Sequence, residues 1–296
     1  MATPTRRFGF RNRQLGNCAE CRVKTRTTPG RAQRLLWAAG AMLTTASCTP
    51  AAKDGAQAVG SEVPVIYVDR RIETLDSGRN EYRAGYEQGL AACIEGGRPT
   101  APLGKEQVEL IGTARWQLWV APGRRAVRQE AWSYRFGTGL DICNFSLDVI
   151  GDHSYYDETQ SVRLDLSTNE RTISTPDAPL ATGPAHAPDA QYLALVRKEG
   201  YTGPIKRMVA GQPCDEWRSP WGATTCIWSG GTQWGFTTQP DDQFMEMEGV
   251  DLHRIVLQAE PAAASIGDRL STEKFSLNAP LDLDRMLPTL ATKGGQ

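Results

Sequence analysis

The stretch Gly211–Phe236, GQPCDEWRSPWGATTCIWSGGTQWGF, contains two of the seven cysteines, four of the eight tryptophans and five glycines. The pattern predicts two short strands that are linked by a disulfide between Cys214 and Cys226. Gly230-Gly231 then predicts a turn that leads into a third strand. The residues of this stretch indicate a structural element, and they do not suggest a reaction.

Strand patterns continue upstream, between Thr113 and Ile173. Apolar and polar residues alternate from Ala114 to Val120, and glycine-containing turns separate this run from the next ones. Successive strands with short turns predict an antiparallel sheet. Val63–Val68 predicts the first strand, which Pro64 should keep near an edge. Further strands are expected at residues 132–136, 143–149, 154–157, 162–166, 171–174, 205–210, 252–259 and 270–277.

Two helices are expected to pack on this sheet. Apolar residues at helical spacing predict the first over residues 81–94, and Gly96-Gly97 should end it. Asp189 is the expected N-cap of the second, which runs to Lys198. Residues 281–290 predict a closing segment or short helix. The chain therefore belongs to the α+β class, with one domain over 63–296 or, alternatively, two halves divided near 175–188, where proline, alanine and glycine are frequent.

The N-terminal 47 residues differ in charge from the rest. They contain nine Lys or Arg and a single acid, Glu20, although the whole chain has a net charge of −1. Arg31–Arg34 precede a short apolar run and several small residues, a layout typical of a secretory signal peptide. We expect translation to begin near Val23, because residues 1–22 do not fit such a signal. An acidic body with a basic leader argues against a nucleic-acid partner.

Ala46-Ser47-Cys48 resembles the lipobox of bacterial lipoproteins, although Thr45 stands where leucine is usual. The resemblance implies that Cys48 is lipidated and becomes the first residue of the mature chain. The alternative is cleavage after Ala46, which would release a soluble periplasmic or secreted protein. Thr49 in place of aspartate resembles the signal for transfer to the outer membrane. Residues 48–62 are small and polar, and they should form a flexible tether.

Four cysteines follow Cys48: Cys93, Cys143, Cys214 and Cys226. An even number in an exported chain favours two disulfides, for which three connectivities exist. If Cys214 pairs with Cys226, then Cys93 pairs with Cys143 by elimination, and the first helix is pinned to the sheet. The alternatives are buried free thiols and a zinc site, but no matching histidines accompany the cysteines.

The sequence contains few groups suited to catalysis. It has three histidines, and it lacks the motifs of serine hydrolases, zinc proteases and phosphate-binding loops. Asp152, His153 and Asp157 could form a metal or acid–base cluster, but they are more simply explained as a polar turn. The acidic run from Asp241 to Asp251 matches no calcium loop, and we expect it to be solvated. We therefore expect no catalytic residue, no metal and no cofactor.

Seven tryptophans fall in the predicted sheet region. Trp116 and Trp119 are three residues apart in the chain, so in a strand their side chains should lie on opposite faces of the sheet. Some of the tryptophans should therefore fill the core, while others line a groove. The candidates for the walls of a ligand cavity are Trp116, Trp132, Trp228, Trp234 and Phe236.

Two segments carry a resemblance to a known family: VAGQPC, residues 209–214, and FSLNAPLD, residues 275–282. With the lipoprotein signal, the early helix and the strand meander, they are similar to the LolA-like superfamily of periplasmic lipoprotein carriers and their lipoprotein relatives. The resemblance covers about residues 113–288. It implies a half-barrel, in which a strongly curved antiparallel sheet closes over helices around an apolar cavity. The cysteine pair departs from the best-known carriers, and a lipid anchor suits a membrane-fixed receptor better than a soluble shuttle.

The expected function is therefore non-enzymatic. An exported lipoprotein, anchored to the outer membrane and facing the periplasm, should bind an apolar ligand or acyl chain. The alternatives are a structural or assembly lipoprotein without a ligand and, with less support, a hydrolase. The expected partners are the membrane, through the lipid anchor, and a lipid or acyl ligand, but not nucleic acid; the sequence identifies no protein partner.

Overall fold

The computed structural model describes residues 63–138, 142–176, 190–240, 253–263 and 265–290. The chain divides into two units, Met1–Gly55 and Ala56–Gln296, and every described residue belongs to the second. The leader, Cys48, the tether, Asp189 and the acidic run all lie outside the described residues. No helix in the described ranges is both long enough and apolar enough to cross a membrane.

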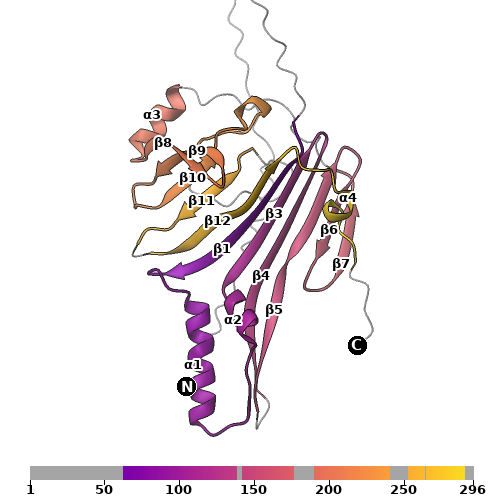
Figure 1. The fold of residues 1–296 in the computed structure, drawn as a ribbon, viewed down its shortest axis with the longest axis vertical. Coiled ribbons are helices and arrows are strands. Elements are labelled where there is room, and N and C mark those ends of the chain that lie inside the picture. The colour runs from indigo at the N-terminus through magenta and orange to yellow at the C-terminus, as the bar shows by residue number, and fades with distance from the viewer. Residues whose placement is uncertain (1–62, 139–141, 177–189, 241–252, 264, 291–296) are drawn as a thin grey trace, which may run out of the picture. The chain divides into compact units, whose positions relative to one another are not determined.

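The described residues form one large, mostly antiparallel sheet with a few short helices (Figure 1). Its strand order is β7-β6-β5-β4-β3-β1-β12-β11-β10-β9-β8, so the path ends at two separate edges, and β2 pairs with β5 beside this path. The strands are β1 (Ile66–Asp76), β2 (Thr100–Ala101), β3 (Thr113–Ala121), β4 (Arg124–Thr138), β5 (Cys143–Asp157), β6 (Ser161–Asp165), β7 (Glu170–Ser174), β8 (Thr202–Val209), β9 (Gln212–Arg218), β10 (Thr224–Trp228), β11 (Val256–Glu260) and β12 (Ile266–Leu277).

The first strand, β1, lies in the middle of the sheet, between β3 and β12. The expectation that Pro64 keeps this strand near an edge is wrong. The pairing of β1 with its two neighbours begins at Ile66. Pro64 lies before this point, so its lack of a backbone N–H removes no hydrogen bond between strands. β1 therefore joins two meanders, β3 to β7 on one side and β8 to β12 on the other.

The long strand β5 runs without a break where the sequence predicted a turn after Gly151. Gly151 has a φ of 147°, and a Cβ atom at this position would lie 2.0 Å from the carbonyl oxygen of Gln129 on β4. The glycine therefore permits a close approach of two strand backbones instead of a turn. As a result, His153 is buried within the sheet, and the expectation of a polar turn here is wrong.

The tryptophan-rich stretch contains β9 and β10, which the Cys214–Cys226 disulfide joins as expected. Gly230-Gly231 does not lead into a third strand, which corrects the sequence prediction. The chain instead enters a short 3₁₀ helix, η1 (Thr232–Trp234). A Cβ atom on Gly231 would lie 2.3 Å from Cζ3 of Trp228, so the glycine lets the backbone fold against the indole ring.

Both predicted helices are present, a short helix lies within residues 281–290 as one of the two expectations for that segment, and one further short helix was not predicted. The helices are α1 (Glu81–Glu95), α2 (Lys105–Leu110), α3 (Ala190–Lys198) and α4 (Leu283–Met286). α1 begins after Asn80, whose side chain accepts a hydrogen bond from the backbone N–H of Arg83, and it ends at Gly96. The six residues of α2 are too few to show helical periodicity, so the sequence did not predict it.

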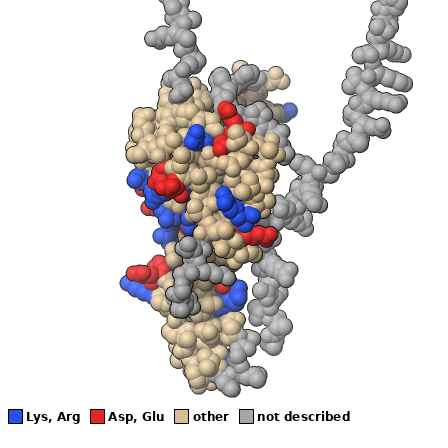
Figure 2. Space-filling model, turned by 90° about the vertical axis from the view of Figure 1, so that its right-hand side faces the viewer, with Lys and Arg blue, Asp and Glu red and all other residues tan. Residues whose placement is uncertain are grey.

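A hairpin arm extends beyond the neighbouring strands. β3 pairs with β4 only as far as Trp132, and β6 pairs with β5 only from Asp152 onward. Residues 133–138 and 143–148 therefore form the arm, which contacts β2 and α1. The Cys93–Cys143 disulfide ties α1 to the arm, as predicted. On the face drawn in Figure 2, few charged side chains are visible at the lower end, and charges of both signs are intermixed above it.

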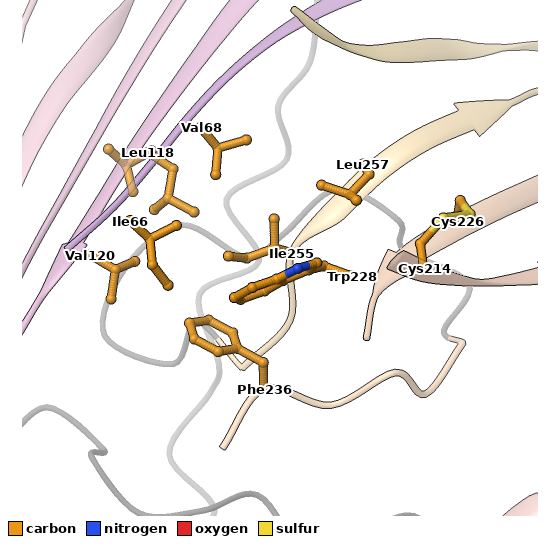
Figure 3. Packing of buried hydrophobic residues seen from close by; sticks show 11 residues of the cluster. Ile66, Val68, Leu118, Val120, Cys214, Cys226, Trp228, Phe236, Ile255 and Leu257 are labelled. Carbon is orange, nitrogen blue, oxygen red and sulfur yellow. A yellow bond between two sulfur atoms is a disulfide. The ribbon is translucent and has the colours of Figure 1, made fainter. Parts of the chain in front are cut away.

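Alternating residues give the sheet two apolar faces. On one, called here the Trp228 face, Ile66 and Leu118 pack with Trp228 and Phe236 around the disulfide-clipped hairpin (Figure 3). On the other, the Trp119 face, Tyr67, Trp119 and Tyr155 pack with Met286 of α4. Trp116 and Trp119 thus belong to clusters on opposite faces, as the odd separation predicted.

Candidate polar cavity on the Trp119 face

A row of polar side chains crosses the Trp119 face. The pairing register sets His153 of β5 opposite Arg128 of β4, and Arg128 opposite Gln117 of β3. Gln117 in turn lies opposite Asp69 of β1, which is paired with Lys274 of β12. Directly opposed residues in an antiparallel sheet project to the same face. Five strands therefore contribute one polar residue each to a single line.

A cavity of about 530 Å³ lies over part of this row. Its sheet side consists of Arg115, Gln117, Trp119, Arg128, Glu130 and His153. The remaining lining comes from the β6–β7 region and the C-terminal segment, through Leu164, Leu166, Asn169, Asp284, Arg285, Leu287 and Thr289. The volume falls within the usual range of small-molecule sites.

The β1 and β3 side of the cavity is held by a hydrogen-bonded network. Arg115 donates from Nε and Nη2 to the two carboxylate oxygens of Asp69, at 2.9 and 2.6 Å. Gln117 donates to the hydroxyl of Tyr67 at 2.7 Å, and that hydroxyl donates to Asp69 at 3.1 Å. Burial would raise the pKa of Asp69, but the bonds and charge of Arg115 outweigh it and hold the pKa below its usual range. Asp69 is therefore ionised and fixes Arg115.

A second pair lies on β4. Arg128 donates from Nε and Nη2 to the same oxygen, Oε1, of Glu130, at 3.1 and 2.5 Å. Within the described ranges, Oε2 of Glu130 and Nη1 of Arg128 have no hydrogen bond to the protein. Both residues line the cavity, so they supply an acceptor and a donor beyond their own pair.

His153 is the most deeply buried titratable group of the cavity, with a side chain that is 4% exposed. Burial and then the charge of Arg128 lower its pKa to about 4, against the effect of a hydrogen bond with the backbone of Met286. Because that bond raises the pKa, an imidazole N–H must donate it. Nε2 has no partner in the described part of the chain, so we assign the proton to Nδ1, which leaves a lone pair on Nε2. Neutral His153 is therefore a buried acceptor.

The five aromatic residues predicted as cavity walls lie outside this lining. Trp228 stacks on Trp234, with ring centroids 6.0 Å apart, and its centroid lies 5.4 Å from that of Phe236. Trp116 is buried in a neighbouring cluster, where the guanidinium carbon of Arg70 lies 5.6 Å from its ring centroid. Trp132 is half-buried on β4. Four of the five thus pack within clusters of the Trp228 face.

The three residues considered for a hydrolase do not converge. Asp152 and His153 are neighbours on β5, so their side chains point to opposite faces. Asp152 accepts a hydrogen bond from Ser154 and lies near Arg163, whereas Asp157 accepts bonds from Thr159 and Gln160 in the following turn. Each aspartate is thus engaged locally.

The polar row was missed because its residues come from five strands. The sequence did contain one signal: Arg115 and Gln117 share a strand face with Trp119, so this face mixes polar and aromatic residues along a single strand. Such mixing is unusual for a strand buried on both sides. It does not indicate which strands lie beside β3.

The chain matches no protein-family model, and no curated protein is similar to it. Within the residues that the structure describes, no three His, Cys, Asp or Glu side chains are grouped so that they could hold a metal ion.

Proposed function

We propose that the protein is a non-enzymatic binding protein of the bacterial cell envelope, with its ligand in the cavity on the Trp119 face. The observation that carries this proposal is His153, which lines the cavity and whose buried Nε2 lacks a partner in the described ranges. A buried polar atom without a partner costs about 1–3 kcal/mol. A ligand that donates a hydrogen bond to Nε2 would remove this cost.

The geometry around His153 supports a site prepared before binding. Arg115 and Arg128 are each held by two hydrogen bonds to a carboxylate, so their orientation does not depend on the ligand. A preorganised site loses less conformational entropy when it binds. The proposal includes the half-barrel curvature that the LolA-like resemblance implies, and an open antiparallel sheet with short helices is consistent with it.

The envelope location rests on the leader and the disulfides. Two disulfides favour an oxidising compartment such as the periplasm. We propose that Cys48 is lipidated and anchors the protein to the outer membrane. Mass spectrometry of the mature N-terminus should find an acylated Cys48, and Cys48→Ser should release the protein into the soluble fraction. An unmodified terminus at Ser47, or retention of residues 1–22, would contradict the anchor.

Native mass spectrometry tests the ligand site. The full chain with Cys48→Ser, produced with its own leader and purified from the periplasm, should carry a bound small molecule. Thr289→Trp places an indole in the cavity and should abolish this bound mass. Thr172→Trp places the same ring on the exposed edge strand β7 and should leave it unchanged. An empty parent chain would favour the structural or assembly role, and equal loss in both variants would argue against this cavity.

A further inference from the structure

Charged groups of both signs surround the cavity. Arg115 pairs with Asp69 and Arg128 pairs with Glu130. Arg285 lies 3.8 Å from Asp282, and Asp284 adds a further carboxylate to the lining. His153 is neutral near pH 7 because its pKa is about 4. An anionic ligand would meet these carboxylates, and a cationic ligand would meet the guanidinium groups, so neither sign of charge is favoured.

The groups left over from these pairs include both donors and acceptors. Nη1 of Arg115 and Nη1 of Arg128 remain as donors, because the carboxylates take only Nε and Nη2. The acceptors are Oε2 of Glu130, Oε1 of Gln117 and Nε2 of His153. A hydroxyl group donates one hydrogen bond and accepts others, so it can satisfy both kinds of partner.

The same cavity offers apolar surface. Trp119 lies in its floor, with the ring centroid 6.1 Å from that of His153, and Leu164, Leu166 and Leu287 border it. A fatty acid would use this surface, and its carboxylate could accept hydrogen bonds from the two arginines. It has no group that donates to the acceptors, which would stay unpaired at a cost for each buried group. A sugar ring has hydroxyl groups at its edge and C–H bonds on its faces, so it can use both kinds of surface.

We propose that the ligand of this cavity is a neutral, hydroxyl-rich compound, namely a saccharide unit. The inference rests on the proposed function, because it names the ligand class of the same cavity. The saccharide has two possible sources, a free sugar or a sugar unit that is part of a cell-wall glycan or a glycolipid. The chemistry of recognition is common to both.

Isothermal titration calorimetry of the Cys48→Ser chain tests the ligand class. The probes are maltose and N,N′-diacetylchitobiose as free saccharides, with inorganic phosphate and dodecanoate as charged comparators. Sedimentation with peptidoglycan sacculi, and with vesicles that contain a glucosyl diacylglycerol, tests the two bound forms of sugar. We expect binding in at least one of the three saccharide forms and none to phosphate or dodecanoate.

Two substitutions assign the binding to this cavity. Glu130→Gln removes a charged acceptor and should weaken saccharide binding about tenfold or more. His153→Phe removes the imidazole nitrogens but keeps an aromatic ring, and it should weaken saccharide binding several-fold. The matched control is Glu216→Gln, which alters a similar Arg–Glu pair between β8 and β9, with Arg207, away from the cavity. It should bind as the parent does.

Two results would overturn the inference. One is the absence of binding in all three saccharide forms, and the other is dodecanoate or phosphate binding that Glu130→Gln and His153→Phe abolish. In the second case the cavity remains a ligand site and only the ligand class is wrong. In the first case, native mass spectrometry of the parent chain decides separately whether the cavity holds another ligand.

Discussion

At the scale of single residues, a few positions determine how closely backbones and rings approach. Gly151 allows β5 to pass β4 where a side chain would collide with the Gln129 carbonyl. Two residues later, His153 depends on this close approach, because it is buried beside Arg128 and Trp119. The conformation of one glycine therefore supports the buried acceptor of the proposed ligand site.

Gly151→Ala should be severely destabilising. Its Cβ would lie 2.0 Å from a backbone oxygen, and its φ of 147° disfavours a side chain. We expect a loss of about 3 kcal/mol in the free energy of unfolding, measured by urea denaturation. Gly137→Ala, on β4, is the control: its nearest neighbour would be 3.6 Å away, so the change should stay within about 0.5 kcal/mol. Equal effects would contradict the close approach.

His153 should make the fold sensitive to mild acid. The pKa of His153 is about 4 in the folded protein, whereas the ordinary pKa of a histidine is 6.5. Between pH 4 and pH 6.5, His153 is therefore protonated in the unfolded chain and neutral in the folded protein. Stability should therefore rise with pH across this window, by about 3 kcal/mol in total, and level off above it. Urea denaturation at about pH 7 and about pH 4.5 should show a smaller difference for His153→Phe than for the parent. An unchanged difference would mean that His153 is not buried in its neutral form.

At the scale of elements, the hairpin arm depends on contacts other than strand pairing. Residues 133–138 and 143–148 pair mainly with each other, and apolar residues of α1, among them Tyr86, pack against them. The ring of Tyr86 lies 5.1 Å from that of Phe145. The Cys93–Cys143 disulfide holds the helix in this position. The arm is thus a local unit that one covalent link secures.

Removal of the Cys93–Cys143 disulfide by a double change to alanine should loosen the arm. The link joins residues separated by 50 positions, so the chain-entropy model gives about 4 kcal/mol, against about 3 kcal/mol for Cys214–Cys226 with a separation of 12. Amide hydrogen exchange should accelerate in α1 and in residues 133–148 more than in β1 or β3. The double alanine change at Cys214 and Cys226 should leave exchange in the arm unchanged. Uniform acceleration across the sheet would show that the arm does not open separately.

At the scale of the whole described sheet, β1 connects the two meanders. It pairs with β3 on one side and, along all of its eleven residues, with β12 on the other. Neither disulfide links residues before 177 to residues after 189. The association of the two meanders therefore depends on the β1–β12 ladder and the clusters that pack across it, including Ile66 and Trp228.

A cut within residues 177–189 should leave the two fragments associated. After cleavage at a protease site inserted there, the fragments should co-elute in size-exclusion chromatography until denaturant is added. The reason is that the β1–β12 ladder and its apolar clusters remain intact after the cut. Dissociation in native buffer would instead support two independent halves.

The sequence by itself determined the features that depend on local pattern. Alternation predicted an antiparallel sheet, Gly96-Gly97 predicted the end of α1, and the positions of the cysteines predicted both disulfides. These predictions held because period, capping and loop geometry act over a few residues. The tertiary structure alone decided which strands are neighbours. β1 lies between β3 and β12, and His153, Arg128 and Gln117 meet in one row, because strand register is set by contacts between residues far apart in the chain.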